Sequence, residues 1–534
     1  MRRLLYLIAV VAALLPSAWI AFEWRELQHL GIYHDDSLYW VGAKSLASGN
    51  GYRIESLPGQ PHQTKYPPLY PALLSIVWRL YPEFPANLPW AMLLNWLTLP
   101  LFVFVARLLF LDYGFGEGRA AVLSMAVALN PIVLNLSVML MTENLFCGLL
   151  LITMVLAERA GRRGRPWWLA LMAGAAAGAC FLTRSSGLPL LVSAPACFLW
   201  RRQYRNAALF IAAMAPAVAG WILWSRAHLA PSHDLASMYY SDYLGFHLAN
   251  ISLAEMPNLI WLNAGALAFG LSELLIFSDS ITVWSQQLAR LVAIAAIAGT
   301  IRLAWRRSQA QYPLFALLFV LQALAWHYPP HNRFVLPLLP LVLAGFYTEM
   351  THLAGIVRQS WRKPGMADRA AALIVGGLIA GVVALGAWRM QFGARVFLPS
   401  VLKHQRSIFR ANLAAYHWLA RNAPPEALVF AYSDPLMYLY TGRRGMSARI
   451  PPRLLYKAEP KAIEKYVETV PAIAHAHNLR YVLFTAADFQ FDSPHVGLAT
   501  LRRVLRENPD FRLIYESPHA MIYKASQAMH AGRD

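Results

Sequence analysis

The most polar stretch within the apolar part of this chain carries two adjacent carboxylates. It covers residues 23 to 85 and contains the sequence His34-Asp35-Asp36-Ser37. Two like charges so close together raise the pKa of at least one carboxyl, because each disfavours the ionisation of the other. A carboxyl in that state suits a general base or a cation ligand. The pair alone leaves a second interpretation open, which is a solvated loop whose two acids are incidental.

Three further ionisable residues lie at the ends of apolar segments. Glu143 precedes one apolar run, Arg184 follows another, and Arg333 opens a third. An ionisable group at such a boundary is costly unless it faces a cavity or a partner. Each has an ordinary alternative, since an acid stabilises the first turn of a helix and an arginine extends toward lipid headgroups. The loop charges place all three on the same membrane face as Asp35 and Asp36, which predicts an outward-facing site at the bilayer boundary.

The elements that must position these residues are membrane-spanning helices. The 534 residues are 57% hydrophobic and 14% charged, and their mean hydropathy is +0.40, which excludes a single soluble domain. Apolar runs recur at about the length of ~20 residues that an α-helix needs to cross a bilayer. We predict about eleven crossings, at residues 4 to 22, 86 to 110, 119 to 138, 144 to 158, 166 to 183, 187 to 200, 206 to 225, 286 to 304, 311 to 327, 333 to 350 and 370 to 389.

Basic residues set the predicted orientation. Every second loop is rich in arginine, which places those loops and the N-terminus in the cytoplasm and makes the protein an integral inner (plasma) membrane protein. Residues 4 to 20 follow two arginines and no cleavage site comes after them, so we interpret this segment as a retained signal anchor. Residues 259 to 277 would break the alternation if they crossed, and they contain Asn263 and Glu273. We therefore predict an interfacial or re-entrant helix there.

The composition changes after residue 390. Alternating helical and strand patterns predict an extracytoplasmic α/β domain over residues 391 to 534, following a membrane domain over residues 1 to 390. The expected strands are at residues 427 to 432, 480 to 485, 512 to 516 and 520 to 524, and the expected helices at 406 to 420, 460 to 478 and 496 to 507. The last ten or so residues are expected to fray.

Two other classes of function are disfavoured. The net charge of +19 would suit a nucleic-acid partner only if the basic residues formed one exposed soluble face, and most of them lie in short loops between apolar runs. The three cysteines, Cys147, Cys180 and Cys197, lie within apolar runs without CxxC spacing or nearby histidines. They are predicted to be packing residues and not ligands of a metal cluster.

The order and the sidedness of four short motifs resemble the GT-C glycosyltransferases, in particular the branch of protein O-mannosyltransferases and the lipid A aminoarabinose transferase. The resemblance covers roughly residues 1 to 350, and the segment from Tyr438 to Arg443 is similar to the outer domain of bacterial members. The motifs are Asp35-Asp36-x-x-Tyr39, Lys65 followed by Pro67-Pro68-Leu69, Thr142-Glu143-x-x-Phe146, and Arg333-Phe334-x-Leu336-Pro337-x-x-Pro340.

This resemblance implies an enzyme that transfers a sugar from a polyprenyl phosphate to a glycan, lipid or protein acceptor. Asp35 matches the base that deprotonates the acceptor hydroxyl, and Asp36 and Glu143 match accessory acids. Lys65 and Arg333 match positions near the carrier phosphate, although Tyr66 stands between the lysine and the two prolines, where the aminoarabinose transferase has none.

Two further roles follow from residue type and position. Arg184 joins the phosphate-binding set because the loop charges place it on the same membrane face. A divalent cation held by Asp35, Asp36 and Glu143 is compatible with their carboxylates, since hard oxygen ligands suit Mg²⁺ or Mn²⁺.

Two rival classes remain. A transporter or lipid flippase would also carry charges at membrane depth, but transporters show paired halves with broken helices, and this chain has no internal repeat. A structural assembly protein would leave Asp35, Asp36 and Arg333 without a purpose. The sequence therefore favours the transferase.

The predicted topology can be tested with reporter fusions. A reporter joined after Arg395 is expected to be active outside the cytoplasm, and one joined after Arg163 inside it, because basic loops stay in the cytoplasm. Alkaline phosphatase and green fluorescent protein, each fused at both positions, report the two sides. Both fusions on the same side would contradict the predicted number of crossings.

Overall fold

The computed structural model divides into two compact units, each made of three chain segments. The first unit contains Met1–Glu23, Leu93–Trp221 and Pro257–Ser400, and the second contains Trp24–Met92, Ile222–Met256 and Val401–Asp534. The structure describes residues 2–162, 164–232, 234–248, 251–278, 283–305, 310–361, 366–451, 454, 460–486, 488–489 and 494–526. Arg163, Arg306, Arg307, Arg362 and Lys363 of the basic loops, and the last eight residues, lie outside these described ranges.

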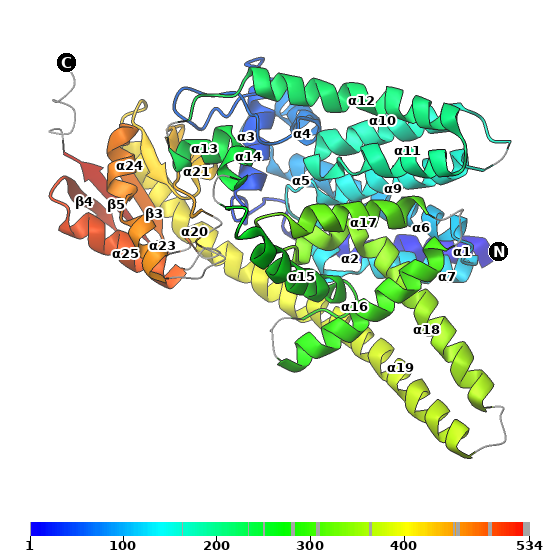
Figure 1. Ribbon diagram of the computed structural model, residues 1–534. Helices are drawn as coiled ribbons and strands as arrows, with labels where there is room; N and C mark the ends of the chain where they lie inside the picture. Colours follow the sequence, from blue (N-terminus) through cyan, green and yellow to red (C-terminus); the bar gives the residue numbers. More distant parts are fainter. Residues whose placement is uncertain are drawn as a thin grey trace. The chain divides into compact units, whose positions relative to one another are not determined.

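The first unit is helical (Figure 1). Each of the segments expected to cross the membrane is helical over most of its length. The helices, with two short helical turns, are α1 (Arg2–Ala12), α2 (Leu15–Glu23), α6 (Thr98–Asp112), α7 (Glu117–Ala128), α8 (Pro131–Ser137), α9 (Glu143–Ala160), α10 (Trp168–Thr183), η1 (Ser185–Gly187), α11 (Leu190–Trp200), α12 (Tyr204–Ala227), α15 (Met256–Glu273), α16 (Val283–Ala304), α17 (Gln311–Leu324), η3 (Asn332–Leu338), α18 (Leu339–Trp361) and α19 (Met366–Phe392).

Length and composition identify five candidate membrane spans among the described residues. They are Arg2–Glu23, Leu88–Asp112, Tyr204–Ala227, Asn332–Trp361 and Asp368–Asn422. The pair α7 and α8, bent by 58° between the two helices, makes a sixth if it counts as one span. Four shorter apolar helices accompany them, at Leu69–Leu80, Trp168–Thr183, Ser185–Trp200 and Gln311–Leu324. The chain is thus a multi-pass membrane protein.

Helix α15 covers most of the stretch predicted to be interfacial or re-entrant, and it is not among the candidate spans. The Asn263 side chain is buried, and its amide donates to the carbonyl oxygens of Leu324 at 2.9 Å and Trp326 at 2.5 Å. Leu324 is the last residue of helix α17 and Trp326 lies just beyond it, so the asparagine satisfies carbonyl groups at the end of that helix. Whether α15 lies at the interface remains a prediction.

Two pairs of glycines four residues apart, Gly174 with Gly178 and Gly377 with Gly381, predict close helix packing from the sequence, and the structure gives the two pairs different surroundings. A Cβ on Gly174 would lie 2.3 Å from the backbone oxygen of Phe210 in α12, and one on Gly178 would lie 3.1 Å from Ala217. Close packing at this first pair is confirmed. A Cβ on Gly377 or Gly381 would meet nothing within 4 Å, so the prediction for the second pair is wrong.

A tight contact that the four-residue spacing missed joins helices α16 and α18. A Cβ on Gly299 would lie 1.8 Å from the backbone oxygen of Gly345, and one on Gly345 would lie 2.5 Å from that of Ala296. The two glycines belong to different helices. A search for small residues within one helix therefore cannot reveal this approach.

Basic residues of the loops pair with acids within the first unit. Arg201 lies 2.9 Å from the buried carboxylate of Glu158, which also accepts the backbone N–H of Gln311 at 2.9 Å. Arg159 lies 2.8 Å from Asp112. Ion pairing of this kind reduces the cost of a carboxylate within an apolar bundle.

The second unit contains a mixed five-stranded sheet of order β2-β1-β3-β5-β4. Figure 1 labels three of its strands, β3, β5 and β4. The strands are β1 (Val429–Ala431), β2 (Gly445–Met446), β3 (Tyr481–Thr485), β4 (Phe511–Glu516) and β5 (Ala520–Ala525). The pairs β1–β2 and β1–β3 are parallel, and the pairs β3–β5 and β5–β4 are antiparallel. The four predicted strands are confirmed, and β2, which is two residues long, was not predicted.

Helices of the second unit come from all three of its segments. Helix α5 (Leu88–Trp96) straddles the boundary between the two units. A π-helical turn of the first unit, η4 (Gly393–Phe397), precedes α20, which also crosses that boundary. The other helices are α3 (Asp35–Ala47), α4 (Leu69–Leu80), α13 (Leu235–Ser241), α14 (Tyr243–Leu248), α20 (Leu398–Asn422), α21 (Asp434–Thr441), α23 (Pro460–Val467), α24 (Val470–Ala476) and α25 (Pro494–Glu507).

One hydrophobic core joins these three segments. Leu38, Ile54 and Leu57 of the first polar stretch belong to the same buried cluster as Phe430 and Val482 of the sheet. The segment before residue 256 adds four more members, Ala236, Tyr239, Tyr240 and Phe246. Burial of apolar surface stabilises by about 25 cal/mol per Å². The first polar stretch is therefore built into the core of the C-terminal sheet.

The contact at Gly174 gives a stability test with a matched control. Leucine at residue 174 must displace the backbone of α12, so Gly174→Leu is expected to cost at least the ~1–3 kcal/mol typical of overpacking. Gly377→Leu enters open space and is expected to leave stability unchanged. Thermal unfolding of both purified variants in one detergent measures the difference. Equal midpoints for the two variants would contradict the contact.

Candidate functional site

Helix α3 begins at Asp35, so both carboxylates of the acidic pair lie in its first turn. The preceding residue, His34, has a φ of 59° in the left-handed region. Its carbonyl oxygen accepts the backbone N–H of Leu38 at 3.1 Å and the hydroxyl of Ser37 at 2.9 Å. Acids are favoured at this position because the N-terminus of a helix carries partial positive charge.

The structure gives the two carboxylates different surroundings. Asp36 is buried, and its carboxylate accepts the backbone N–H of Ser37 at 2.6 Å and of Gly31 at 3.0 Å. Gly31 has a φ of +91°, and a Cβ there would lie 2.7 Å from Leu436, so this position requires glycine. Asp36 therefore holds the loop that enters α3.

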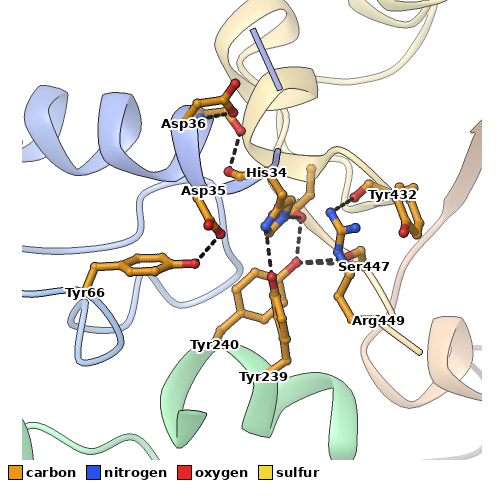
Figure 2. Close-up of polar contacts among 11 residues, drawn as sticks. His34, Asp35, Asp36, Tyr66, Tyr239, Tyr240, Tyr432, Ser447 and Arg449 are labelled. Carbon is orange, nitrogen blue, oxygen red and sulfur yellow. Dashed lines mark hydrogen bonds and ion pairs between the residues drawn. The ribbon is translucent and has the colours of Figure 1, made fainter. Parts of the chain in front are cut away.

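Asp35 is partly exposed, and its carboxylate has a tyrosine as a partner. The hydroxyl of Tyr66 donates to Asp35 Oδ1 at 2.5 Å, as Figure 2 shows. Tyr66 is the residue that interrupts the expected spacing between Lys65 and the two prolines. A hydrogen bond from a neutral donor orients a carboxylate. Of the two acids, Asp35 is thus the more accessible.

Lys65 lies beside aromatic rings in the same unit. Its side chain is buried, and its Nζ lies 3.5 Å from the ring centroid of Tyr239 and 5.0 Å from that of Tyr66. A cation over a ring face is stabilised by the quadrupole of the ring. These rings hold the lysine in place, and the lysine directly precedes Tyr66, the tyrosine that contacts Asp35.

His34 is the centre of a buried polar cluster that sequence reasoning did not identify (Figure 2). Its Nε2 lies 3.0 Å from Asp434 Oδ1, and its Nδ1 lies 3.2 Å from the hydroxyl of Tyr239. The hydroxyl of Tyr240 donates to the same oxygen of Asp434 at 2.5 Å and lies 2.9 Å from Ser447 Oγ. No sequence motif links His34 to Asp434, because 400 residues separate them.

Burial decides the protonation of this cluster. It lowers the pKa of His34 well below its usual value, and the charges of Arg449 and Lys65 act in the same direction. Burial also raises the pKa of Asp434 to about 7, against the opposing effects of the Tyr240 hydrogen bond and of Arg449. The histidine is therefore neutral near pH 7, which allows Nε2–H to donate to Asp434 while Nδ1 accepts from Tyr239.

In the first unit, the three remaining candidates meet at one carboxylate. Glu143 Oε1 lies 2.8 Å from Arg184 Nη1 and 3.4 Å from Arg333 Nη1. Arg184 also donates to the hydroxyl of Thr142 at 2.8 Å. The Glu143 side chain is 2% exposed, whereas those of Arg184 and Arg333 are 21% and 15% exposed. Two guanidinium groups around one carboxylate leave a net positive charge, which suits an anion.

The predicted site residues thus form two groups. Asp35, Asp36 and Lys65 belong to the second unit, and Glu143 with its two arginines belongs to the first. Within the described ranges, no group of three or more His, Cys, Asp and Glu side chains is arranged to hold a metal ion. The loop charges had placed Glu143, Arg184 and Arg333 on the same membrane face. The sequence did not indicate that Glu143 is the ion-pair partner of both arginines.

Comparisons with solved structures define the class of fold. The chain is similar to ArnT from Cupriavidus metallidurans bound to undecaprenyl phosphate, with 13% identity and a TM-score of 0.53 over 97% of this chain and 98% of that chain. It is also similar to the archaeal oligosaccharyltransferase AglB from Archaeoglobus fulgidus in complex with an inhibitory peptide and a dolichol-phosphate. That match has 12% identity and a TM-score of 0.52 over 98% of this chain and 74% of that chain.

The fold is therefore similar to those of two membrane glycosyltransferase structures, ArnT and AglB, over nearly the full length of this chain. No protein-family model and no curated protein sequence matches it. At this low identity the likeness shows the fold alone.

Proposed function

We propose that this protein is an inverting glycosyltransferase that moves a sugar from a polyprenyl-phosphate donor to an extracytoplasmic glycan, lipid or protein. The observation that carries the proposal is the GT-C-like fold, shared with an ArnT structure bound to undecaprenyl phosphate and an AglB structure bound to a dolichol-phosphate. The partly exposed Asp35 and the two arginines around Glu143 supply the chemistry that such a donor requires.

The reaction is one displacement at the anomeric carbon. Asp35 takes the proton of the acceptor hydroxyl while the acceptor oxygen forms a bond to the anomeric carbon. The bond from that carbon to the phosphate oxygen breaks on the opposite face, and its electron pair leaves with the polyprenyl phosphate. Arg184 and Arg333 stabilise the negative charge that develops on the phosphate, and Lys65 adds a third cation.

The accessory acids act through their partners. Asp36 is occupied by the backbone of the loop that enters α3, so it sets the conformation of that loop. Glu143 orients both guanidinium groups and offsets part of their repulsion, which keeps them in place before the donor arrives. The divalent cation considered at Asp35, Asp36 and Glu143 is not part of this proposal, because no three such side chains are arranged to hold one within the described ranges.

The proposed topology completes this assignment. About eleven crossings within residues 1 to 390 form the membrane catalytic domain, and the α/β domain over residues 391 to 534 lies outside the cytoplasm. The basic loops support the orientation, because lysine and arginine hold short loops in the cytoplasm. The inner membrane is the proposed location.

Asp35→Asn tests the enzymatic role. The amide keeps the size of the carboxylate and cannot accept the proton, so transfer is expected to fall by about 10²- to 10⁴-fold. The measurement is transfer of radiolabelled sugar from a panel of undecaprenyl-phosphate-linked sugars to membrane-lipid and glycan extracts by the purified full chain.

Asp510→Asn, an exposed acid of the same unit, is the matched control and should transfer at the wild-type rate. An Asp35→Asn variant that equals the wild type would defeat the assignment of the base. A wild type that moves the lipid across vesicles without transferring its sugar would favour a flippase.

Arg333 tests donor recognition. Loss of a charge-assisted hydrogen bond costs about 1.5–3 kcal/mol, so Arg333→Ala should weaken binding of undecaprenyl phosphate by about 10- to 100-fold. Arg333→Lys should restore only part of the affinity, because the planar fork of the guanidinium is lost.

The matched control for this test is Arg358→Ala, which changes an exposed arginine in helix α18. The measurement is the Kd of undecaprenyl phosphate for the purified full chain of each variant. Wild-type affinity in Arg333→Ala would remove this residue from the donor site.

A further inference from the structure

We propose that Asp434 of the C-terminal sheet domain is a positioning residue for sugar transfer, because its hydrogen bond to His34 fixes the first turn of helix α3 and hence the carboxylate of Asp35. This inference rests on the proposed function, since it concerns the base of that reaction. It gives the C-terminal domain a role that does not depend on contact with the donor or the acceptor.

The first step is the state of His34. This residue directly precedes Asp35, and its φ of 59° is uncommon for a residue with a Cβ. A residue held in such a conformation depends on its surroundings, which must outweigh the local strain. The ring of His34 is 3% exposed and has hydrogen-bond partners at both nitrogens, Asp434 and Tyr239. These bonds determine where the backbone enters α3.

The second step is the rigidity of the anchor. Asp434 is the first residue of α21, and its Oδ1 also accepts the hydroxyl of Tyr240. That hydroxyl in turn accepts the backbone N–H of Ser447 at 3.1 Å, next to strand β2. The oxygen that binds His34 is thus tied to the sheet through a short chain of buried hydrogen bonds.

The third step is the docking of α21 along α3. Leu436 lies against Gly31, and Lys44 Nζ donates to the hydroxyl of Tyr438 at 3.1 Å, near the last turn of α3. Tyr438 in turn donates to Glu55 at 3.3 Å. The contact between Asp434 and His34 therefore belongs to an interface between α21 and α3. Within this interface, His34 is the residue adjacent to Asp35 in the sequence.

The chemistry of the bond suggests a conservative variant. Asp434 acts through Oδ1, while its Oδ2 is buried without a hydrogen-bond partner among the described residues. Asparagine places a carbonyl oxygen at the Oδ1 position and can accept from both His34 and Tyr240. Asp434→Asn therefore preserves the proposed bond, whereas Asp434→Ala removes it.

The expected results are specific to a positioning role. A displacement of about 1 Å at a reacting group can lower the rate by about 10²-fold, so Asp434→Ala should lower kcat by up to about 10²-fold. The KM for the undecaprenyl-phosphate-linked sugar that the wild type uses should not change, because the arginines of the first unit are untouched. Asp434→Asn should recover most of the wild-type kcat.

A second buried aspartate, Asp488, is the matched control: it lines one small pocket with Gly31 and Leu436, but its carboxylate binds Thr485 and not His34. Burial also raises the pKa of Asp488 to about 7, and its carboxylate binds the backbone N–H and the hydroxyl of Thr485, both at 2.9 Å. Asp488→Ala should lower the unfolding midpoint of the full chain and leave kcat per folded molecule unchanged. Hydrogen exchange supplies a second readout, since amides 35 to 40 should exchange faster in Asp434→Ala and not in Asp488→Ala.

Wild-type kcat and wild-type exchange in Asp434→Ala would overturn the positioning role, as would a loss of kcat in Asp434→Asn as large as in Asp434→Ala. If Asp434→Ala does not fold, Tyr240→Phe removes one bond to the same oxygen, and its kcat should fall at constant KM. An unchanged kcat in Tyr240→Phe overturns the positioning role.

The outcomes separate the two proposals. An inactive Asp35→Asn with a fully active Asp434→Ala defeats only the positioning role, and a fully active Asp35→Asn defeats the proposed function.

Discussion

A charged group in an apolar surrounding is costly without a partner, and such pairings recur in both units over the part of the chain that the structure describes. In the first unit one carboxylate, Glu143, serves two arginines, and Glu158 serves Arg201 and a backbone N–H. Leaving any one of these charges without its partner would cost several kcal/mol, on the order of 3–5 for a buried pair. The partially exposed arginines are therefore stable before a ligand binds, and they retain a positive excess for an anion.

The same constraint explains why the first polar stretch joins the C-terminal sheet. Residues 24 to 92 contain buried polar side chains such as His34 and Asp36 together with the apolar residues Leu38 and Ile54. The sheet supplies a hydrophobic core for the apolar side chains, and Asp434 supplies a hydrogen bond for the histidine. Since the acidic turn contacts both, its surroundings come from a part of the chain that is distant in sequence.

The sequence predicted the elements better than it predicted their partners. Hydrophobic periodicity located the strands β1, β3, β4 and β5, because each has a long enough run of apolar residues. It missed β2, whose two residues carry no periodic signal. Small residues four apart were a sound indication at Gly174 and a wrong one at Gly377, because spacing says that a close approach is allowed and not that a neighbour exists.

The candidate site shows the same limit. Residue type and sidedness brought Glu143, Arg184 and Arg333 together correctly. They could not distinguish Asp35 from Asp36, since the two are adjacent and differ only in the hydrogen bonds that the folded loop offers them. Nor could they find Asp434, because a partner 400 residues away leaves no local pattern.

The central claim is that Arg184 and Arg333 bind the phosphate of a polyprenyl-phosphate donor. A cryo-electron microscopy structure of the full chain in lipid nanodiscs with undecaprenyl phosphate tests it most directly. We expect the phosphate to accept hydrogen bonds from both guanidinium groups. A phosphate bound elsewhere, with Glu143 still the sole anion at both arginines, would contradict the claim.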